Sequence, residues 1–261
     1  MPHAVDWAER VAAASRAWVW VPETAIRAET REYLLVRFPD YAEHRLVLLD
    51  FRPEGDPATL TDEVLARARE FEEPELVWWV KLGSPGGMDE LVRSRGGVLD
   101  ETLDVLALDL ASGTPDLGTP SVELRWTTDK QTLRDAYRVL KVVFGGDVPP
   151  EQRLRIESDQ VRRDVEAGRG GGVVAYLDDE PVGTGGLTVA GDVGRLWSGS
   201  VVEGHRGRGV YRALLTARLE YAVRHGATMA LVKGRVETSG PILRRAGLTA
   251  HGQERSYRVL L

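Results

Sequence analysis

The chain has no cysteine among its 261 residues. It therefore has no disulfide, no thiolate metal ligand and no cysteine nucleophile, whatever compartment it occupies. It also lacks an apolar run long enough to cross a bilayer. Its first residues do not combine a basic start with an apolar core, as a signal peptide would. These absences predict a cytoplasmic protein with no membrane partner.

Basic residues are outnumbered by acidic ones, 34 against 40, which gives a formal net charge of −6. This balance argues against a nucleic-acid partner. No group of His, Asp or Glu has the spacing of metal ligands, so no metal is expected. After Gly204, however, the chain carries eleven Arg and Lys and only three Glu. A basic segment inside an acidic protein suits a small polyanion better than a duplex.

Hydrophobic periodicity predicts two α/β (α+β) halves, joined by a segment rich in Gly, Pro, Ser and Thr at residues 111–120. In the first half we expect helices over residues 5–16, 61–71 and 88–95, and strands over 17–21, 33–38, 46–51, 76–81 and 103–110. This half should form a domain over residues 1–115.

The second half, residues 120–261, opens with an expected strand over 122–126 and a helix that starts at a capping box of Thr128 and Gln131. A second helix should run from Pro149 to about residue 167. Three strands with short turns, over 173–177, 182–189 and 195–202, predict an antiparallel meander. After residue 210 we expect a helix, a buried strand over 227–233, a short helix over 241–246 and a last strand over 251–261.

The two halves share an order of elements. Residues 65–96 and 215–247 each contain the end of a helix, an apolar strand ending in Lys, a loop with Pro and a short helix followed by Gly. We interpret this as an internal duplication, although any α/β unit has some of these features. The first copy has residues 52–57, Arg-Pro-Glu-Gly-Asp-Pro, before its helix. Two acids and two prolines are unsuited to a phosphate, so this copy is expected not to bind one.

The second copy has a different segment at that point. Residues 201–211 read as the end of a strand, a turn in which Gly207 and Gly209 alternate with Arg206 and Arg208, and the start of a helix. Glycine permits positive φ and the close approach of an anion. The first amides of a helix have no partner within it and attract phosphate groups. The segment therefore predicts a site for a cofactor that carries a diphosphate.

The second half resembles the GNAT superfamily of acyl-CoA-dependent N-acetyltransferases. Residues 206–211, Arg-Gly-Arg-Gly-Val-Tyr, fit that family's pyrophosphate loop, Arg/Gln-x-x-Gly-x-Gly/Ala, except at Tyr211. The meander before the loop, and the helix, strand and short helix after it, extend the resemblance over residues 122–261. The first half looks like a degenerate second copy. The resemblance thus implies two tandem GNAT-like domains, each a mixed, mostly antiparallel sheet flanked by helices.

The resemblance implies acetyl-CoA as co-substrate, bound between the strands over 195–202 and 227–233. Its pantetheine arm would pair with the backbone of the strand end, and its pyrophosphate would contact the loop; the implied binding residues are Val201, Val202, Arg206, Gly207, Arg208, Gly209, Val210 and Tyr211. Gly199 suits a bulge that parts the two strands, and the alternative is a glycine required only for packing. The Tyr211 side chain either points outward or narrows the site.

An amine must lose a proton before it attacks a thioester, and the departing thiolate must gain one. We expect Glu237 as the base, with Glu203 second, and Tyr257 as the acid, with Ser239 second. The alternatives are that Glu237 pairs with Arg235 and that Tyr257 is a core residue. Leu243 stands where many members of the family have a tyrosine acid.

These residues predict an N-acetyltransferase that moves acetyl from acetyl-CoA to a small-molecule or peptide amine by direct transfer in a ternary complex. Two alternatives remain open. One is a pseudo-enzyme that binds acyl-CoA without turnover, which the leucine at position 243 favours. The other is a GNAT-fold enzyme that uses a different acyl group. Homodimerisation is left open.

Overall fold

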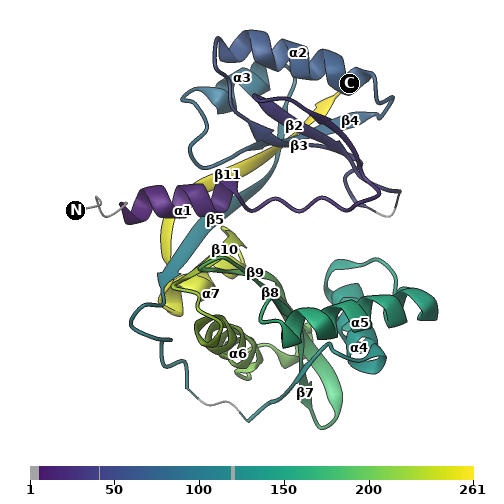
Figure 1. Ribbon diagram of the computed structural model, residues 1–261, viewed down its shortest axis with the longest axis vertical. Coiled ribbons are helices and arrows are strands. Elements are labelled where there is room, and N and C mark those ends of the chain that lie inside the picture. Colours follow the sequence, from purple (N-terminus) through teal and green to yellow (C-terminus); the bar gives the residue numbers. More distant parts are fainter. Residues whose placement is uncertain (1–5, 41, 119–120) are drawn as a thin grey trace. The chain divides into compact units, whose positions relative to one another are not determined.

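The computed structural model describes residues 6–40, 42–118 and 121–261. The chain divides into two compact units, each of which combines helices with a mixed, mostly antiparallel sheet (Figure 1). Unit 1 takes Met1–Val105, Gly234–Pro241 and Ala250–Leu261, and unit 2 takes Leu106–Lys233 and Ile242–Thr249. No helix in the described part of the chain is both long and apolar enough to cross a membrane.

Unit 1 is built mainly from the first elements of the chain. These are α1 (Trp7–Arg16), β1 (Ile26–Glu29), β2 (Tyr33–Arg37), β3 (Leu46–Phe51), α2 (Pro57–Arg69), β4 (Glu75–Val80) and α3 (Met88–Ser94). The first part of β5 (Val98–Asp109) and nearly all of β11 (Thr249–Leu260) also belong to unit 1.

The sheet of unit 1 follows the order β1-β2-β3-β4-β11. Its neighbours are antiparallel except β3 and β4, which run parallel because helix α2 connects them. Helix α2 buries Leu60, Val64 and Ala68 in the core of this unit. Strand β11 pairs with β4 from Arg255 opposite Val80 onward, so residues 255–260 extend the sheet of the first half.

Unit 2 contains the second set of elements. These are β6 (Glu123–Trp126), α4 (Lys130–Phe144), α5 (Glu151–Glu166), β7 (Gly170–Leu177), β8 (Glu180–Ala190), β9 (Val193–Val201), a 3-10 turn η1 (Glu203–His205) and α6 (Val210–Arg224). Most of β10 (Met229–Arg235) and of α7 (Ser239–Arg245) follow in the same unit.

The sheet of unit 2 follows the order β10-β9-β8-β7-β6. Strands β6 to β9 are antiparallel, which confirms the predicted meander, and β10 runs parallel to β9 because helix α6 connects them. Helix α6 packs on one face of this sheet, with Val210 and Leu214 against Val173, and α4 packs on the other, with Ala136 against Val174 (Figure 1). The end of α5 contacts α6, because the Tyr221 hydroxyl donates to Val165 O at 2.7 Å.

Glycines in β8 set the distance between α6 and the sheet. A Cβ atom on Gly183 would come within 2.8 Å of Val210, and one on Gly185 within 2.9 Å of the Arg218 guanidinium carbon. No side chain fits at either position, so the helix packs directly on the backbone of the strand. This close packing fixes the start of α6 beside the end of β9.

Two local expectations are wrong. Residues 17–21 do not form a strand, because their amides bond locally at the end of α1; for example, the Ala17 N–H donates to Ala13 O and that of Val19 to Ala17 O. The edge strand forms later, at Ile26–Glu29. Helix α4 is capped by Asp129, which accepts from the amides of Gln131 and Thr132, and not by Thr128.

The predicted linker lies between the elements of the two predicted domains. Residues 111–118 of the predicted linker contain no helix or strand, and residues 119–120 lie outside the described residues. The division into residues 1–115 and 120–261 remains a prediction. In space, the segments Gly234–Pro241 and Ala250–Leu261 fall with the first half.

Candidate functional site

The segment between β9 and α6 is a tight turn that depends on two glycines. After Val202 the chain makes one 3-10 turn, η1, and then passes through Gly207 and Gly209, with φ of 76° and 85°. These left-handed conformations favour glycine, since a Cβ atom would add strain. Space around Gly207 is open, with no atom within 4 Å of a Cβ built there. The two glycines therefore leave the backbone of the turn uncovered.

A run of main-chain amides in this turn has no acceptor. The amides of His205 and Arg206 bond back to Val202 O and Glu203 O, and the amide of Ala213 makes the first bond of the helix, to Gly209 O at 3.0 Å. Between them, the N–H groups of residues 207–212 have no hydrogen-bond acceptor in the described part of the chain. Gly209 is the N-cap and has no side chain that could cap the helix. Six donors and the positive end of the α6 dipole thus meet at one place.

The charged side chains around the turn are mostly cationic. Arg206, Arg208 and Arg212 are exposed, and none of them forms an ion pair within the described residues. The Arg206 Nε donates to Val201 O at 3.4 Å. Glu203 is the acid of the turn, and it is exposed as well. Exposed guanidinium groups beside unbonded amides suit phosphate oxygens, which accept hydrogen bonds from both.

Strands β9 and β10 separate before β9 ends. Their parallel ladder covers four positions, from Val193 opposite Met229 to Leu196 opposite Val232. Beyond it, a bulge interrupts β9: Trp197 faces Gly186 and Ser200 faces Thr184, so that two β9 residues oppose one residue of β8. Ser198 has a φ of 51° at this point. The bulge that the sequence predicted at Gly199 is confirmed, and the parting of the strands begins next to it.

The end of β9 offers one backbone edge. The Val202 N–H donates to Val182 O and the Val202 carbonyl accepts from the His205 N–H, each at 2.9 Å. Both main-chain groups of Val202 are therefore bonded already. Alternate residues of an antiparallel strand direct their main-chain groups to opposite edges, so those of Val201 point away from β8. Of the two residues expected to pair with a cofactor arm, Val201 is thus the one whose N–H is available, while its carbonyl accepts from the Arg206 Nε.

Tyr211 points toward the sheet, which settles the alternative left open by its sequence position. Its hydroxyl and the Arg218 Nη2 would each lie 3.3 Å from a Cβ atom built on Gly199. Arg218 is 2% exposed; its Nε donates to Leu214 O at 2.9 Å and its Nη1 to Gly186 O at 3.3 Å. Burial lowers the pKa of Arg218, and the interaction with Tyr211 partly offsets this. A buried cation and a phenol therefore lie directly under the bulge.

Sequence reasoning missed Arg218. The residue follows Leu214 by four positions and precedes Tyr221 by three, so helical spacing places it on the buried face of α6. That spacing was the available signal. A charged residue on an apolar helix face is unusual enough to mark a special environment.

The three expected catalytic residues lie in unit 1, whereas the turn lies in unit 2. Glu237 is exposed and has no ion-pair partner among the described residues. The alternative that it pairs with Arg235 is wrong, because Arg235 pairs with Glu101. Ser239 opens α7, and its hydroxyl accepts a hydrogen bond from the Arg235 N–H at 2.9 Å.

Tyr257 is fully buried in the core of unit 1. Its hydroxyl donates to Asp89 Oδ1 at 2.6 Å. Burial, with the Asp89 carboxylate, raises the pKa of Tyr257 to about 12. These contacts describe a packing residue, and its role as an acid stays a prediction. Leu243, where the resemblance would have a tyrosine, is 1% exposed and belongs to the core of unit 2.

No group of three or more His, Asp or Glu in the described ranges could hold a metal ion. Unit 2 thus has an anion site at the turn before α6, and next to it a gap between β9 and β10.

Comparison with known proteins relates part of the chain to a known family. Residues 133–238 match the model of the Acetyltransferase (GNAT) family. No match was found among curated proteins.

Solved structures match nearly the whole chain. A GCN5-related N-acetyltransferase from Kribbella flavida is 17% identical, with a TM-score of 0.70 over 98% of this chain and 96% of its own. One from Sphaerobacter thermophilus is 19% identical, with a TM-score of 0.67 over 94% and 84%. A tandem GNAT protein from the clavulanic acid biosynthesis pathway is 16% identical, with a TM-score of 0.64 over 96% and 87%. At these identities the likeness concerns the fold, and it confirms the expected tandem GNAT-like architecture.

Proposed function

Because residues 133–238 carry a GNAT acetyltransferase domain, we propose that the protein transfers an acetyl group from acetyl-CoA to an amine by direct transfer in a ternary complex. Membership of this domain family supports acyl transfer in general. The observation that carries the more specific proposal is the run of unbonded amides at residues 207–212, next to the gap that opens between β9 and β10.

The residues around the turn fit acetyl-CoA in chemistry and in order. The amides of residues 207–212 donate to the diphosphate, and Arg206 and Arg208 add charge-assisted hydrogen bonds. The Val201 N–H, on the edge of β9 that faces away from β8, donates to the pantetheine arm as it would to an added strand. Acetyl-CoA supplies the acetyl group as an activated thioester. The protein holds it beside the acceptor, and this proximity accounts for much of the rate.

Proton transfer is assigned to residues of unit 1. Glu237 is the proposed base, because its carboxylate is exposed and no cation in the described chain neutralises it. Ser239 and Tyr257 are the proposed proton donors to the thiolate. Glu237→Gln should slow turnover and leave the affinity for acetyl-CoA unchanged. An unaltered rate with several amines would remove Glu237 from the mechanism.

The acceptor is proposed to be a small-molecule amine or a peptide amine. We place the reaction in the cytoplasm, and a homodimer remains compatible with it. The exposed position of Glu237 suits an acceptor that arrives from solvent.

Calorimetric titration with acetyl-CoA tests the proposal. Replacing Arg206 and Arg208 together by Glu reverses two charges beside the unbonded amides, and binding should be lost. The matched control is the double change of Arg162 and Arg163 to Glu on α5, which alters the net charge equally and should leave the affinity unchanged. Equal affinities for the two double variants would overturn the proposed site.

A second function, acyl-CoA binding without turnover, is favoured by two observations. Leu243 is part of the apolar core, and Tyr257 is fully buried with its hydroxyl bonded to Asp89. Release of free coenzyme A thiol, measured over a panel of amines, separates an enzyme from a binding protein. The same assay with propionyl-CoA and succinyl-CoA tests whether another acyl group is preferred.

A further inference from the structure

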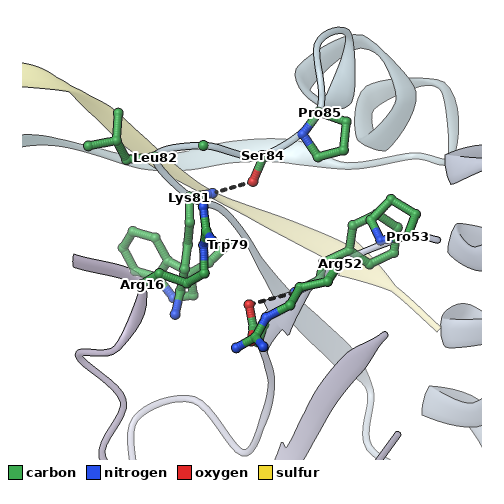
Figure 2. A pocket seen from close by; sticks show the side chains of 11 residues that line it. Arg16, Arg52, Pro53, Trp79, Lys81, Leu82, Ser84 and Pro85 are labelled. Atoms are coloured by element: carbon green, nitrogen blue, oxygen red, sulfur yellow. Dashed lines mark hydrogen bonds and ion pairs between the residues drawn. The ribbon is translucent and has the colours of Figure 1, made fainter. Parts of the chain in front are cut away.

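Unit 1 contains a pocket of its own, at the carboxyl ends of its two parallel strands. The pocket has a volume of about 260 Å³. Its walls come from the end of α1, from the residues that follow β3 and from the residues that follow β4. Figure 2 shows Arg16, Trp79 and Lys81 gathered on one side of the pocket, and Arg52 and Pro53 on the other.

The pocket exists because β3 and β4 part early. Their parallel ladder covers two positions, Val47 opposite Val77 and Leu48 opposite Trp78, although β3 runs on to Phe51 and β4 to Val80. Unit 2 has the same arrangement at β9 and β10. Crevices outside the carboxyl ends of parallel strands are common ligand sites in α/β proteins. Unit 1 thus has a gap between β3 and β4 that corresponds to the gap between β9 and β10 in unit 2.

The charge of the pocket favours an anion. Arg16, Arg52 and Lys81 line it, together with one carboxylate, Asp50, which forms an ion pair with Arg52. Arg16 has no carboxylate partner among the described residues. Its guanidinium lies over Gly83, where a Cβ atom would come within 2.6 Å of Nη2. The absence of a side chain at this position therefore leaves room for the cation at the wall of the pocket.

The surrounding structure holds these groups in place. Ser15, next to Arg16, donates from its hydroxyl to Glu254 at 2.7 Å, and Glu254 is 1% exposed, behind the lining residues. The turn after β4 is closed by the Ser84 hydroxyl, which accepts from the Lys81 N–H at 3.0 Å (Figure 2). Side chains on fixed backbone lose less entropy when they bind a ligand, so such a site is partly preorganised.

The remaining walls are apolar and flat. Trp78 points into the core, and the next residue, Trp79, points to the opposite face and lines the pocket half-buried. Pro53 and Pro85 complete this side. A planar body fits against an indole ring. The pocket volume equals that of about nine water molecules at ~30 Å³ each. The ligand is therefore a small molecule.

A diphosphate does not fit unit 1. The start of α2 is occupied by the chain itself, because Asp56 accepts hydrogen bonds from the amides of Ala58 and Thr59. A second anion there would meet the carboxylate and the bonded amides. The ligand of the pocket is therefore not a coenzyme A ester.

We propose that this pocket binds a small planar carboxylate. Arg16 and Lys81 hold the carboxyl group, and the Trp79 indole packs against the body of the molecule. Guanidinium groups match the two oxygens of a carboxylate with paired hydrogen bonds, which makes Arg16 the main determinant.

Isothermal titration calorimetry of the full chain with sodium benzoate tests the proposal. One molecule should bind, and Arg16→Gln should weaken binding at least tenfold. Trp79→Leu should weaken it severalfold. Arg27→Gln, which removes an exposed arginine of β1, is the matched control and should bind as the unchanged protein does. Circular dichroism establishes that each variant is folded, and Lys81→Met provides a second test of the cationic wall.

Three results would overturn the proposal. They are equal affinity of the Arg16 and Arg27 variants for benzoate, competition by inorganic phosphate as strong as by a second carboxylate, and loss of benzoate binding in the variant with Arg206 and Arg208 changed to Glu. The last would place benzoate in unit 2. Retention of benzoate by that variant, together with loss of acetyl-CoA, would show that the two sites are separate.

Discussion

Helices α2 and α6 hold equivalent places in the two units, yet their first turns differ. Each helix connects two parallel strands whose ladder ends early. At the start of α2, the Asp56 carboxylate accepts hydrogen bonds from two amides and from the Thr59 hydroxyl, at 2.8 Å. At the start of α6, Gly209 offers no side chain, and the amides stay unbonded. The N-cap side chain thus determines whether the first amides of the helix remain available to an anion.

The same pair of helices also differs on the buried face. Ala68, near the end of α2, and Arg218, within α6, are both buried. Ala68 packs in an apolar core, whereas Arg218 places a guanidinium beneath a bulged strand. Unit 1 has the more uniform core at this position, and unit 2 has retained polar groups beside its gap. The comparison indicates that unit 2 keeps features that packing alone does not require.

The largest effect should come from giving α6 the acidic first turn of α2. Gly209→Asp places a carboxylate among the unbonded amides and imposes a side chain on a left-handed backbone. We expect acetyl-CoA affinity to fall at least a hundredfold in calorimetric titration. Gly204→Asp is the matched control, because that residue lies in open space within the same segment. Its effect should be no more than severalfold. Similar losses in both variants would mean that general charge, not occupancy of the amides, explains the difference between the helices.

A smaller effect is expected at the buried position of α6. Arg218→Ala should lower the free energy of unfolding by ~2 kcal/mol or more, since it leaves a cavity under the bulge. Arg218→Met fills that space without a buried charge and should be neutral or stabilising. Urea denaturation measures both. If the methionine variant were as unstable as the alanine variant, the hydrogen bonds of the guanidinium would be what holds the bulge.

The variant Tyr257→Phe tests whether Tyr257 in unit 1 is a packing residue or a proton donor. Loss of the hydrogen bond to Asp89 should cost ~1 kcal/mol of stability. Because the folded state raises the pKa of Tyr257 from 10.0 to about 12, its contribution is complete below pH 10 and is lost as the pH rises toward 12. Denaturation at several pH values measures this. A fall in turnover of a hundredfold or more at neutral pH would instead support the acid role.

The smallest effect concerns the cap of α2. Asp56→Ala should lower Tm by a few degrees, because the helix loses its N-cap. Hydrogen bonds from the Thr59 hydroxyl and from two amides lower the pKa of Asp56. Its stabilising contribution is therefore present above the unfolded pKa and is lost as the pH falls through the folded one. Asp56→Ser, which retains a cap, should lie close to the unchanged protein. Calorimetric melting at neutral and acidic pH compares the three chains.

Sequence reasoning reached the parts of the site that local chemistry determines. Gly207 and Gly209 specify left-handed backbone, and Gly199 marked the bulge correctly. Arg218 was missed although helical spacing placed it on the buried face of α6, because an arginine is seldom buried. The strand predicted at residues 17–21 failed because its apolar residues continue the turn that ends α1. The pocket of unit 1 joins three segments far apart in the chain, and only the fold brings them together.

Strand β11 has a consequence for the order of folding. Its residues Arg255–Leu260 pair with β4, although the two strands lie far apart in the sequence. Until that pairing forms, unit 1 exposes the edge of β4. Strands β6 to β9 of unit 2 pair with their neighbours along the chain, so the meander can form first. In pulsed hydrogen exchange during refolding of the full chain, amides of β7 to β9 should therefore be protected before those of β4 and β11.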